Sequence, residues 1–112
     1  MVCPIKTLNQ NKDFRRIYAK SKAHVHPALV TYILKNRVGF CRFGITTSRK
    51  IGNAVVRNRC RRIIYHAFRN IYNEKLDGFD FVFVARGRTA KLKSTDIERI
   101  ILKHLRLSGI IG

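Results

Sequence analysis

The spacing of apolar residues predicts three helices. Positions three and four residues apart are apolar over residues 11–21, which favours a short helix that Asn11 can cap. One apolar stripe runs along residues 54–72 and predicts the longest helix. Thr95-Asp-Ile-Glu98 has the pattern of a capping box, and it opens a last helix that extends to about residue 107.

Alternating and continuous apolar runs predict the strands. Residues 28–34 are rich in β-branched and aromatic side chains, and residues 40–47 alternate between apolar and polar or small positions. We expect these two runs to pair as a hairpin around a turn at residues 36–39. Residues 79–85 are nearly all apolar, which indicates a strand covered on both faces. The order α-β-β-α-β-α predicts a single α+β sandwich, and the general rule makes a crossover through residues 54–72 right-handed.

The charge balance points to a polyanionic partner. The chain has 24 Lys and Arg against 6 Asp and Glu, a net charge of +18, and residues 14–73 hold no acid. Such a field repels itself, so its retention favours nucleic acid as a partner, with a membrane surface as the second candidate. No stretch approaches the roughly 18–20 apolar residues of a membrane span, and the start lacks a signal-peptide pattern. The three cysteines, Cys3, Cys41 and Cys60, form no close pair, which favours reduced thiols in the cytoplasm.

The string Arg57-Asn58-Arg59-Cys60-Arg61-Arg62, here called the arginine box, falls in the first two turns of the long helix. A helix N-terminus already carries partial positive charge, so cations are unfavourable there, and like charges three or four residues apart repel. With phosphate bound, the helix dipole, the free N–H groups and the guanidinium groups all act in the same direction. Asn53 can cap this helix. The alternative is an ordinary solvated basic helix face.

Three aromatic side chains form a second candidate set. Phe14 and Tyr18 share one face of the first helix, and Tyr32 lies on a predicted strand. Bases of single-stranded nucleic acid stack on such rings. The alternative is that all three belong to the core, where we also expect the remaining phenylalanines: Phe40, Phe43, Phe68, Phe79, Phe81 and Phe83.

Catalytic and metal-binding patterns are weak. His24 and His26 lack further ligands at metal spacing, and His104 is expected in the core or at an interface. Cys60 lies on the apolar stripe, so we expect a small buried hydrophobe there. Asp80 alone does not support two-metal phosphodiester chemistry. We therefore expect no metal held by this chain alone and no unaided catalysis.

The ordered string from Arg42 to Ile64 closely resembles the bacterial ribonuclease P protein component. That family is marked by an Arg-Asn-Arg box on a helix, preceded by a Gly-Asn-Ala-Val turn and a Ser-x-Lys segment. Similarity extends over about residues 8–101, including Tyr32 and the run from Asp80 to Arg86. The resemblance implies an α+β fold: a two-layer α/β sandwich with one mixed sheet of about four strands and three helices. The implied order is αβββαβα, with a left-handed β-α-β crossover similar to the second domain of ribosomal protein S5.

The resemblance also implies a function in transfer-RNA maturation. The family forms the protein subunit of a ribonucleoprotein endonuclease that removes the 5′ leader from precursor tRNA, while the catalytic RNA does the chemistry with bound Mg²⁺. Matching positions that would bind the RNA subunit are Arg57, Asn58, Arg59, Arg61, Arg62 and Arg69. Those that would line a cleft for the leader, or lie near its junction with the tRNA, are Phe14, Tyr18, Tyr32, Arg49, Lys50 and Asn53. No membrane and no obligate protein partner are expected.

One departure from the family falls at the end of the arginine box. The family often continues with another arginine and then Glu or Gln, where this chain has Tyr65 and His66. Two other functions stay open on the sequence. A structural ribosomal protein shares the basicity and sometimes the sandwich, and a self-sufficient nuclease or DNA-binding module is the other alternative.

Overall fold

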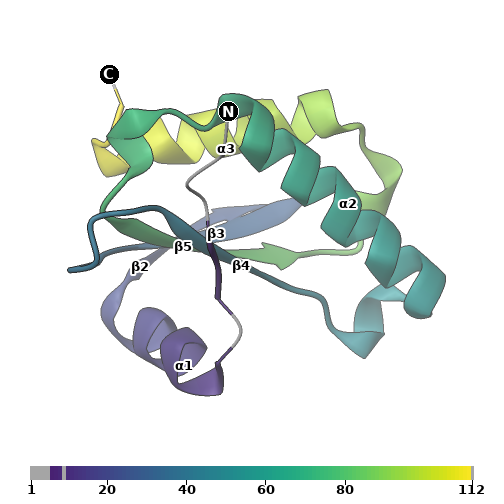
Figure 1. The fold of residues 1–112 in the computed structure, drawn as a ribbon. Helices are drawn as coiled ribbons and strands as arrows, with labels where there is room; N and C mark the ends of the chain where they lie inside the picture. The colour runs from purple at the N-terminus through teal and green to yellow at the C-terminus, as the bar shows by residue number, and fades with distance from the viewer. Residues whose placement is uncertain (1–5, 9, 112) are drawn as a thin grey trace.

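A mixed sheet with its most apolar strand at the centre organises the computed structural model, which describes residues 6–8 and 10–111 (Figure 1). The strand order is β1-β4-β5-β3-β2. The strands are β1 (Lys6–Thr7), β2 (Lys22–His26), β3 (Leu29–Lys35), β4 (Arg42–Thr46) and β5 (Phe79–Ala85). The β5 bounds match the prediction, and its burial confirms that this strand is covered on both faces.

The predicted hairpin between residues 28–34 and 40–47 is wrong. Strand β5 lies between β3 and β4, antiparallel to the first and parallel to the second. A strand that is apolar on both faces is most stable where other strands flank it and helices cover it, so β5 takes the central place. The hairpin in the structure is β2–β3, which turns through residues 27–28, and β4 is shorter than predicted.

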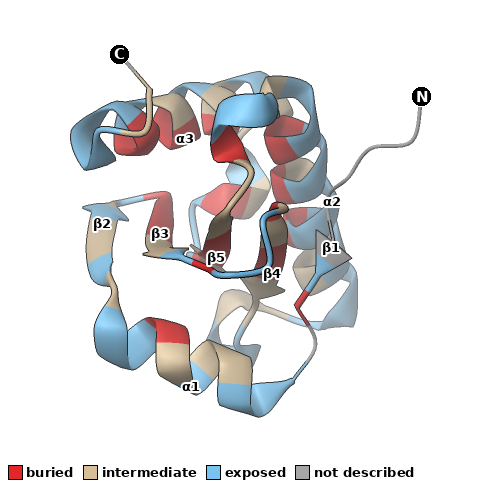
Figure 2. Ribbon diagram, turned by 60° about the vertical axis from the view of Figure 1, so that its left-hand side comes forward, coloured by how far each residue is buried: buried red, intermediate tan, exposed pale blue. Residues whose placement is uncertain are grey.

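The helices lie where the sequence predicts them, within one or two residues. They are α1 (Asn11–Lys20), α2 (Ala54–Ile71) and α3 (Ser94–Ser108), with 3-10 turns η1 (Arg49–Ile51), η2 (Glu74–Leu76) and η3 (Thr89–Lys91). Helices α2 and α3 cover one face of the sheet and α1 the other (Figures 1 and 2). Because α2 joins the parallel strands β4 and β5, it forms the β-α-β crossover, whose left hand stays a prediction from the resemblance.

Of the three predicted helix caps, the structure confirms one, that of α2. The Asn53 side chain accepts the Val56 N–H of α2 at 3.0 Å, as predicted. Helix α1 begins at Asn11, so Gln10 occupies the cap position and the Asn11 cap is wrong. Helix α3 begins one residue before Thr95, which makes Asp96 its third residue. The Asp96 carboxylate therefore accepts the Lys93 N–H at 3.0 Å, and the predicted Thr95–Glu98 box does not form.

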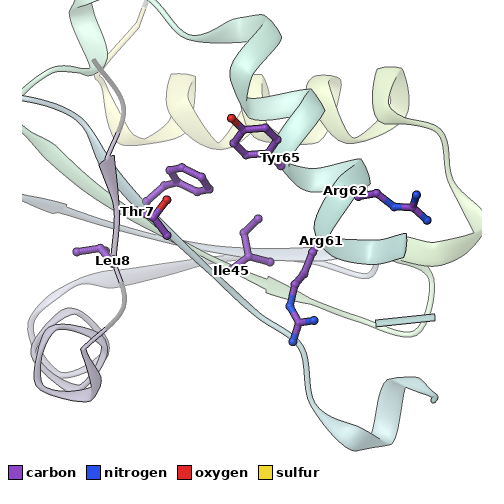
Figure 3. A pocket seen from close by; sticks show the side chains of 7 residues that line it. Thr7, Leu8, Ile45, Arg61, Arg62 and Tyr65 are labelled. Carbon is purple, nitrogen blue, oxygen red and sulfur yellow. The ribbon is translucent and has the colours of Figure 1, made fainter. Parts of the chain in front are cut away.

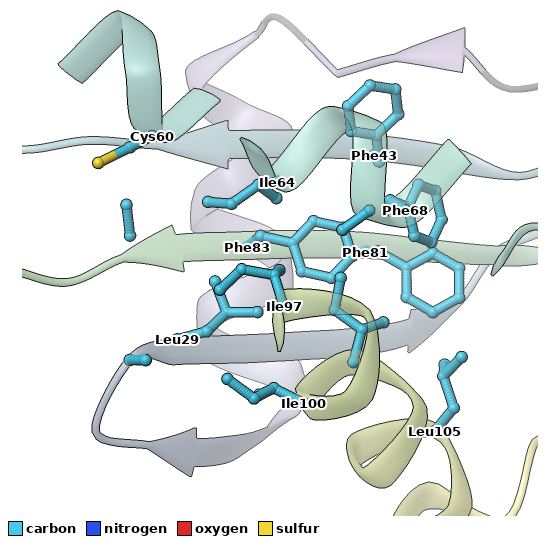
Figure 4. Close-up of a cluster of buried hydrophobic side chains, with 14 of the residues drawn as sticks. Leu29, Phe43, Cys60, Ile64, Phe68, Phe81, Phe83, Ile97, Ile100 and Leu105 are labelled. Carbon is cyan, nitrogen blue, oxygen red and sulfur yellow. The ribbon is translucent and has the colours of Figure 1, made fainter. Parts of the chain in front are cut away.

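The main core fills the space between the sheet and the two helices α2 and α3 (Figure 4). Phe68 of α2 lies 5.0 Å from Phe83 and 5.2 Å from Phe81, ring centroid to centroid, and 5.6 Å from Phe43. These four rings are buried, as expected, whereas Phe40 and Phe79 are only half-buried. Cys60 is also buried in this core, and burial raises the pKa of its thiol.

A buried carboxylate fastens α1 to the opposite face of the sheet. Asp80 of β5 is 0% exposed, and it accepts hydrogen bonds from Arg42 of β4 at 2.8 Å and from Arg16 of α1 at 2.9 Å. Asn36 donates a further bond at 2.8 Å. Burial alone raises the pKa of Asp80, but the hydrogen bonds from Arg42, Asn36 and Arg16 outweigh it and hold that pKa below its ordinary value.

A buried histidine joins α3 to β3. His104 is 2% exposed, and its Nδ1 lies 2.7 Å from the hydroxyl oxygen of Thr31. The ring of His24 stacks against it, with centroids 5.7 Å apart. Burial, together with the neighbouring charges of His24, His26 and Lys103, lowers the pKa of His104 to about 4. The expectation that His104 belongs to the core is confirmed.

This histidine makes the stability of the folded chain depend on pH. Because the pKa of His104 is lower in the folded state than its ordinary 6.5, the unfolded state binds its proton first as the pH falls. We expect the free energy of unfolding to decrease by about 2 kcal/mol between pH 7 and pH 5 through this group. Urea titrations across that range measure it. His104→Gln should remove most of the slope. A smaller slope remains, because burial also lowers the pKa of His24. A slope lost with His66→Gln on the exposed face of α2 would contradict the assignment.

Candidate nucleic-acid interface

The arginine box projects from the first turns of α2 into solvent. Asn58, Arg59, Arg61 and Arg62 are exposed and Arg57 is half-buried, while Cys60 between them faces the core. The first turn of the helix carries no acidic residue. The structure thus brings the predicted basic residues together on one surface, at the helix end where anions bind most favourably.

The box has no carboxylate partner within residues 6–8 and 10–111, where every acidic side chain of the protein lies. The salt bridges of this region involve Arg16, Arg42 and Arg99. Inside the box, the Arg61 guanidinium donates a hydrogen bond of 2.9 Å to the Asn58 side-chain oxygen. The positive charge of the box is therefore open to an external anion.

Two hollows flank Arg62 on the outer surface of α2. One, of about 500 Å³, is lined by Val55, Asn58, Arg61 and Arg62. The other, of about 300 Å³, is lined by Arg59, Arg62, Ile63, His66 and, from α3, Ser94. Arg62 lines both hollows, so the surface of the arginine box has a hollow on each side of this residue. Neither Ile63 nor Ser94 stood out in the sequence, since neither carries charge.

Arg69, two turns further along α2, is exposed but has a ring partner. Its guanidinium carbon lies 6.0 Å from the centre of the Tyr65 ring, which is within the range of a cation–π contact. The same ring lies 5.7 Å from Phe43. Tyr65, the departure at the end of the box, therefore links the basic surface to the apolar edge of the core.

The three aromatic candidates form one continuous row between α1 and the sheet. The ring of Tyr18 lies 6.4 Å from Phe14 and 4.8 Å from Tyr32, and its hydroxyl group is 3.0 Å from that of Thr46 on β4. Phe14 and Tyr32 are half-buried against Ile17 and Val82, whereas Tyr18 is 37% exposed. The rings thus contribute to a small second core and still present an edge to solvent.

Gly44 makes room for this row and was missed in the sequence. A methyl group at its Cα would lie 2.6 Å from the Phe14 ring, closer than any side chain tolerates. A glycine inside a strand often marks such a close approach, so the residue type carried a usable signal. Thr46, which holds Tyr18, carried none.

The remaining candidates follow directly after β4. Arg49 and Lys50 are exposed in η1, three and four residues beyond Thr46, and Asn53 caps α2. The oxygen of the Asn53 side chain is occupied by the cap, so its amide N–H groups are the part open to a ligand. This segment joins the strand under the aromatic row to the helix that carries the box.

The histidine and cysteine candidates belong to the packed interior or to turns. His26 accepts the Ala28 N–H at 3.0 Å, and Cys41 and Cys60 are buried; Cys3 lies outside the described residues. In the described part of the chain, no group of three or more His, Cys, Asp or Glu side chains is placed to hold a metal ion. No described helix is long and apolar enough to cross a membrane.

These features define a class: a small α+β sandwich that has a basic helix without a carboxylate partner among the described residues on one face and a row of aromatic rings on the other, as nucleic-acid-binding proteins have. Comparison with known proteins gives the family. The family model described as Ribonuclease P matches residues 4–107. The chain therefore belongs to the ribonuclease P protein component family.

Curated relatives and solved structures agree with this assignment. A ribonuclease P protein component from Clostridioides difficile is 41% identical over 106 residues, covering 94% of this chain and 93% of that protein. One from Clostridium beijerinckii is 36% identical, covering 95% and 90%. The RNase P protein structure from Staphylococcus aureus superposes with a TM-score of 0.81 at 27% identity, covering 95% and 97% of the two chains. That from Thermotoga maritima gives 0.75 at 25%, covering 90% and 96%.

Proposed function

We propose that this chain binds the catalytic RNA of ribonuclease P through the arginine box and the 5′ leader of precursor tRNA over the aromatic row. The complex would cleave the leader endonucleolytically and give the mature 5′ end of the tRNA. The observation that carries the proposal is the set of box arginines without a carboxylate partner among the described residues. Family membership supplies the RNA as the partner that this charge would contact.

Phosphate binding explains why the box tolerates its own repulsion. Each like-charged pair three or four residues apart on a helix is unfavourable by about 0.2–0.5 kcal/mol. Arg57 with Arg61, and Arg59 with Arg62, are such pairs. With phosphates bound beside them, the arginines of each pair would contribute favourably to the free energy. Binding would also release condensed counterions from the RNA. Arg69, on the same helix, would extend this contact past Tyr65.

Leader binding would use the exposed edges of the aromatic rings. Phe14, Tyr18 and Tyr32 are fixed by packing and by the Tyr18–Thr46 hydrogen bond, so little side-chain freedom would be lost when a base stacks on them. Arg49, Lys50 and the Asn53 amide would then meet the phosphates next to the cleavage site.

The chemistry would be carried by the RNA subunit and its Mg²⁺. Two of the acidic side chains serve other contacts: Asp80 accepts bonds from two arginines and Asp77 accepts one from Tyr72. The protein's contribution would be to position the leader and to screen phosphate repulsion, so that the complex assembles and cleaves at lower Mg²⁺.

Charge reversal in the box tests the RNA contact. Arg59→Glu with Arg62→Glu should lower affinity for the catalytic RNA at least tenfold, because two phosphate contacts become repulsive. Filter binding and precursor cleavage at low Mg²⁺ measure the loss. The control variant, Arg37→Glu with Lys75→Glu, changes the net charge by the same amount near the other end of α2. It should have little effect on RNA affinity or cleavage. Equal losses in both variants would refute a specific contact.

Removal of one ring tests the leader contact. Tyr32→Ala should weaken binding of precursor tRNA to the assembled complex about 5- to 150-fold, the range of one lost base stack, and leave mature tRNA nearly unaffected. Tyr32→Phe keeps the ring and should retain the preference. If Tyr32→Ala weakens both forms of tRNA equally, the leader does not lie on this row.

A further inference from the structure

A pocket opens between α2 and the edge of the sheet, immediately beside the arginine box (Figure 3). Its volume is about 380 Å³, and its walls come from β1, β4, α2 and the residue after β1. The lining residues are Thr7, Leu8, Phe43, Ile45, Arg61, Arg62 and Tyr65. This size lies within the roughly 300–1,000 Å³ of pockets that take small ligands.

One part of the pocket is aromatic and another is cationic. Tyr65 lies above Ile45, Thr7 lies to one side of it, and Arg61 extends down from α2 on its other side (Figure 3). Tyr65 is 38% exposed, although its ring packs beside Phe43 and Arg69. An exposed aromatic ring held by two neighbours is a preformed stacking surface, because little freedom is left for a ligand to remove.

The ligand that fits these walls is flat, has apolar faces and carries negative charge at one side. A nucleotide has these properties: its base can stack on the Tyr65 ring, and its phosphate can reach the guanidinium group of Arg61 beside the pocket. Arg62 extends away from the pocket along the box surface, where it can meet the next phosphate (Figure 3). Both arginines also line the hollow on the outer surface of α2, so the pocket continues the box surface. A strand whose phosphates follow the box therefore passes the opening of the pocket.

We propose that this pocket takes one unpaired base of the RNA subunit, stacked on Tyr65, while Arg61 binds the phosphate of that nucleotide and Arg62 binds the next phosphate along the box. The proposal rests on the proposed function, since it names what the RNA places against the end of the box. It gives Tyr65 a part in RNA binding by stacking, at the position where the family often has the charge of another arginine.

The test compares a variant that lacks the Tyr65 ring with one that keeps an aromatic ring, both in the reconstituted protein–RNA complex. Tyr65→Ala should lower affinity for the catalytic RNA about tenfold, and Tyr65→Phe should bind within about twofold of the wild-type protein. Leu107→Ala, at an exposed apolar residue of α3, is the matched surface control and should bind like wild type. Chemical probing of unpaired bases should show a nucleotide that wild type and Tyr65→Phe protect and Tyr65→Ala leaves reactive.

An abasic nucleotide at the protected position completes the test without altering the fold of the protein. Removing the base while keeping the phosphates should weaken wild-type binding as much as Tyr65→Ala does, with no further loss when both changes are combined. Two fully additive losses, or wild-type affinity in Tyr65→Ala, would overturn the pocket assignment while leaving the box contact intact. A wild-type protein that fails to bind the RNA would overturn the proposed function as well.

Discussion

The positive charge of α2 has no neutralising partner in the described part of the chain, and the surface we assign to RNA depends on this imbalance. Most of the few acidic side chains make other contacts: Asp80 fastens α1 to the sheet, and Asp96 caps α3. On its inner side the helix packs against the core through apolar residues, Cys60 and those that follow it on the buried stripe. The folded chain therefore displays a charge that its own contacts do not use, which is the condition for electrostatic binding of a polyanion.

The two candidate binding surfaces are separate because helices cover both faces of the sheet. Strand β5 is apolar on each side, so α2 and α3 pack against one face and α1 against the other. The arginine box and the aromatic row consequently lie on different layers, joined by the short segment from β4 through η1 to α2. In our account this allows the catalytic RNA and the leader to occupy the protein together. The Asp80 cluster matters to the aromatic row, because it fixes α1, and with it Tyr18, relative to β4.

The sequence was sufficient for features that depend on local periodicity and charge. The three helices, strand β5 and the box surface were predictable because apolar spacing and the missing acids are visible in short windows. Features that depend on long-range pairing were not: the placement of β5 between β3 and β4, the partners of Asp80, and the pocket beside Tyr65 all join distant segments. An aspartate inside an apolar strand and a glycine at position 44 did signal a buried partner and a close approach, although neither names the residue that it meets.

The salt dependence of RNA binding tests the central claim most directly. The logarithm of the affinity for the catalytic RNA should fall linearly with the logarithm of salt concentration, because each bound phosphate releases counterions. Arg59→Gln with Arg62→Gln should reduce the steepness of that line by about 1.5, the equivalent of two lost phosphate contacts. Arg37→Gln with Lys75→Gln should leave it unchanged. Equal slopes for wild type and the box variant would contradict the account, because the arginines would then contact no phosphate.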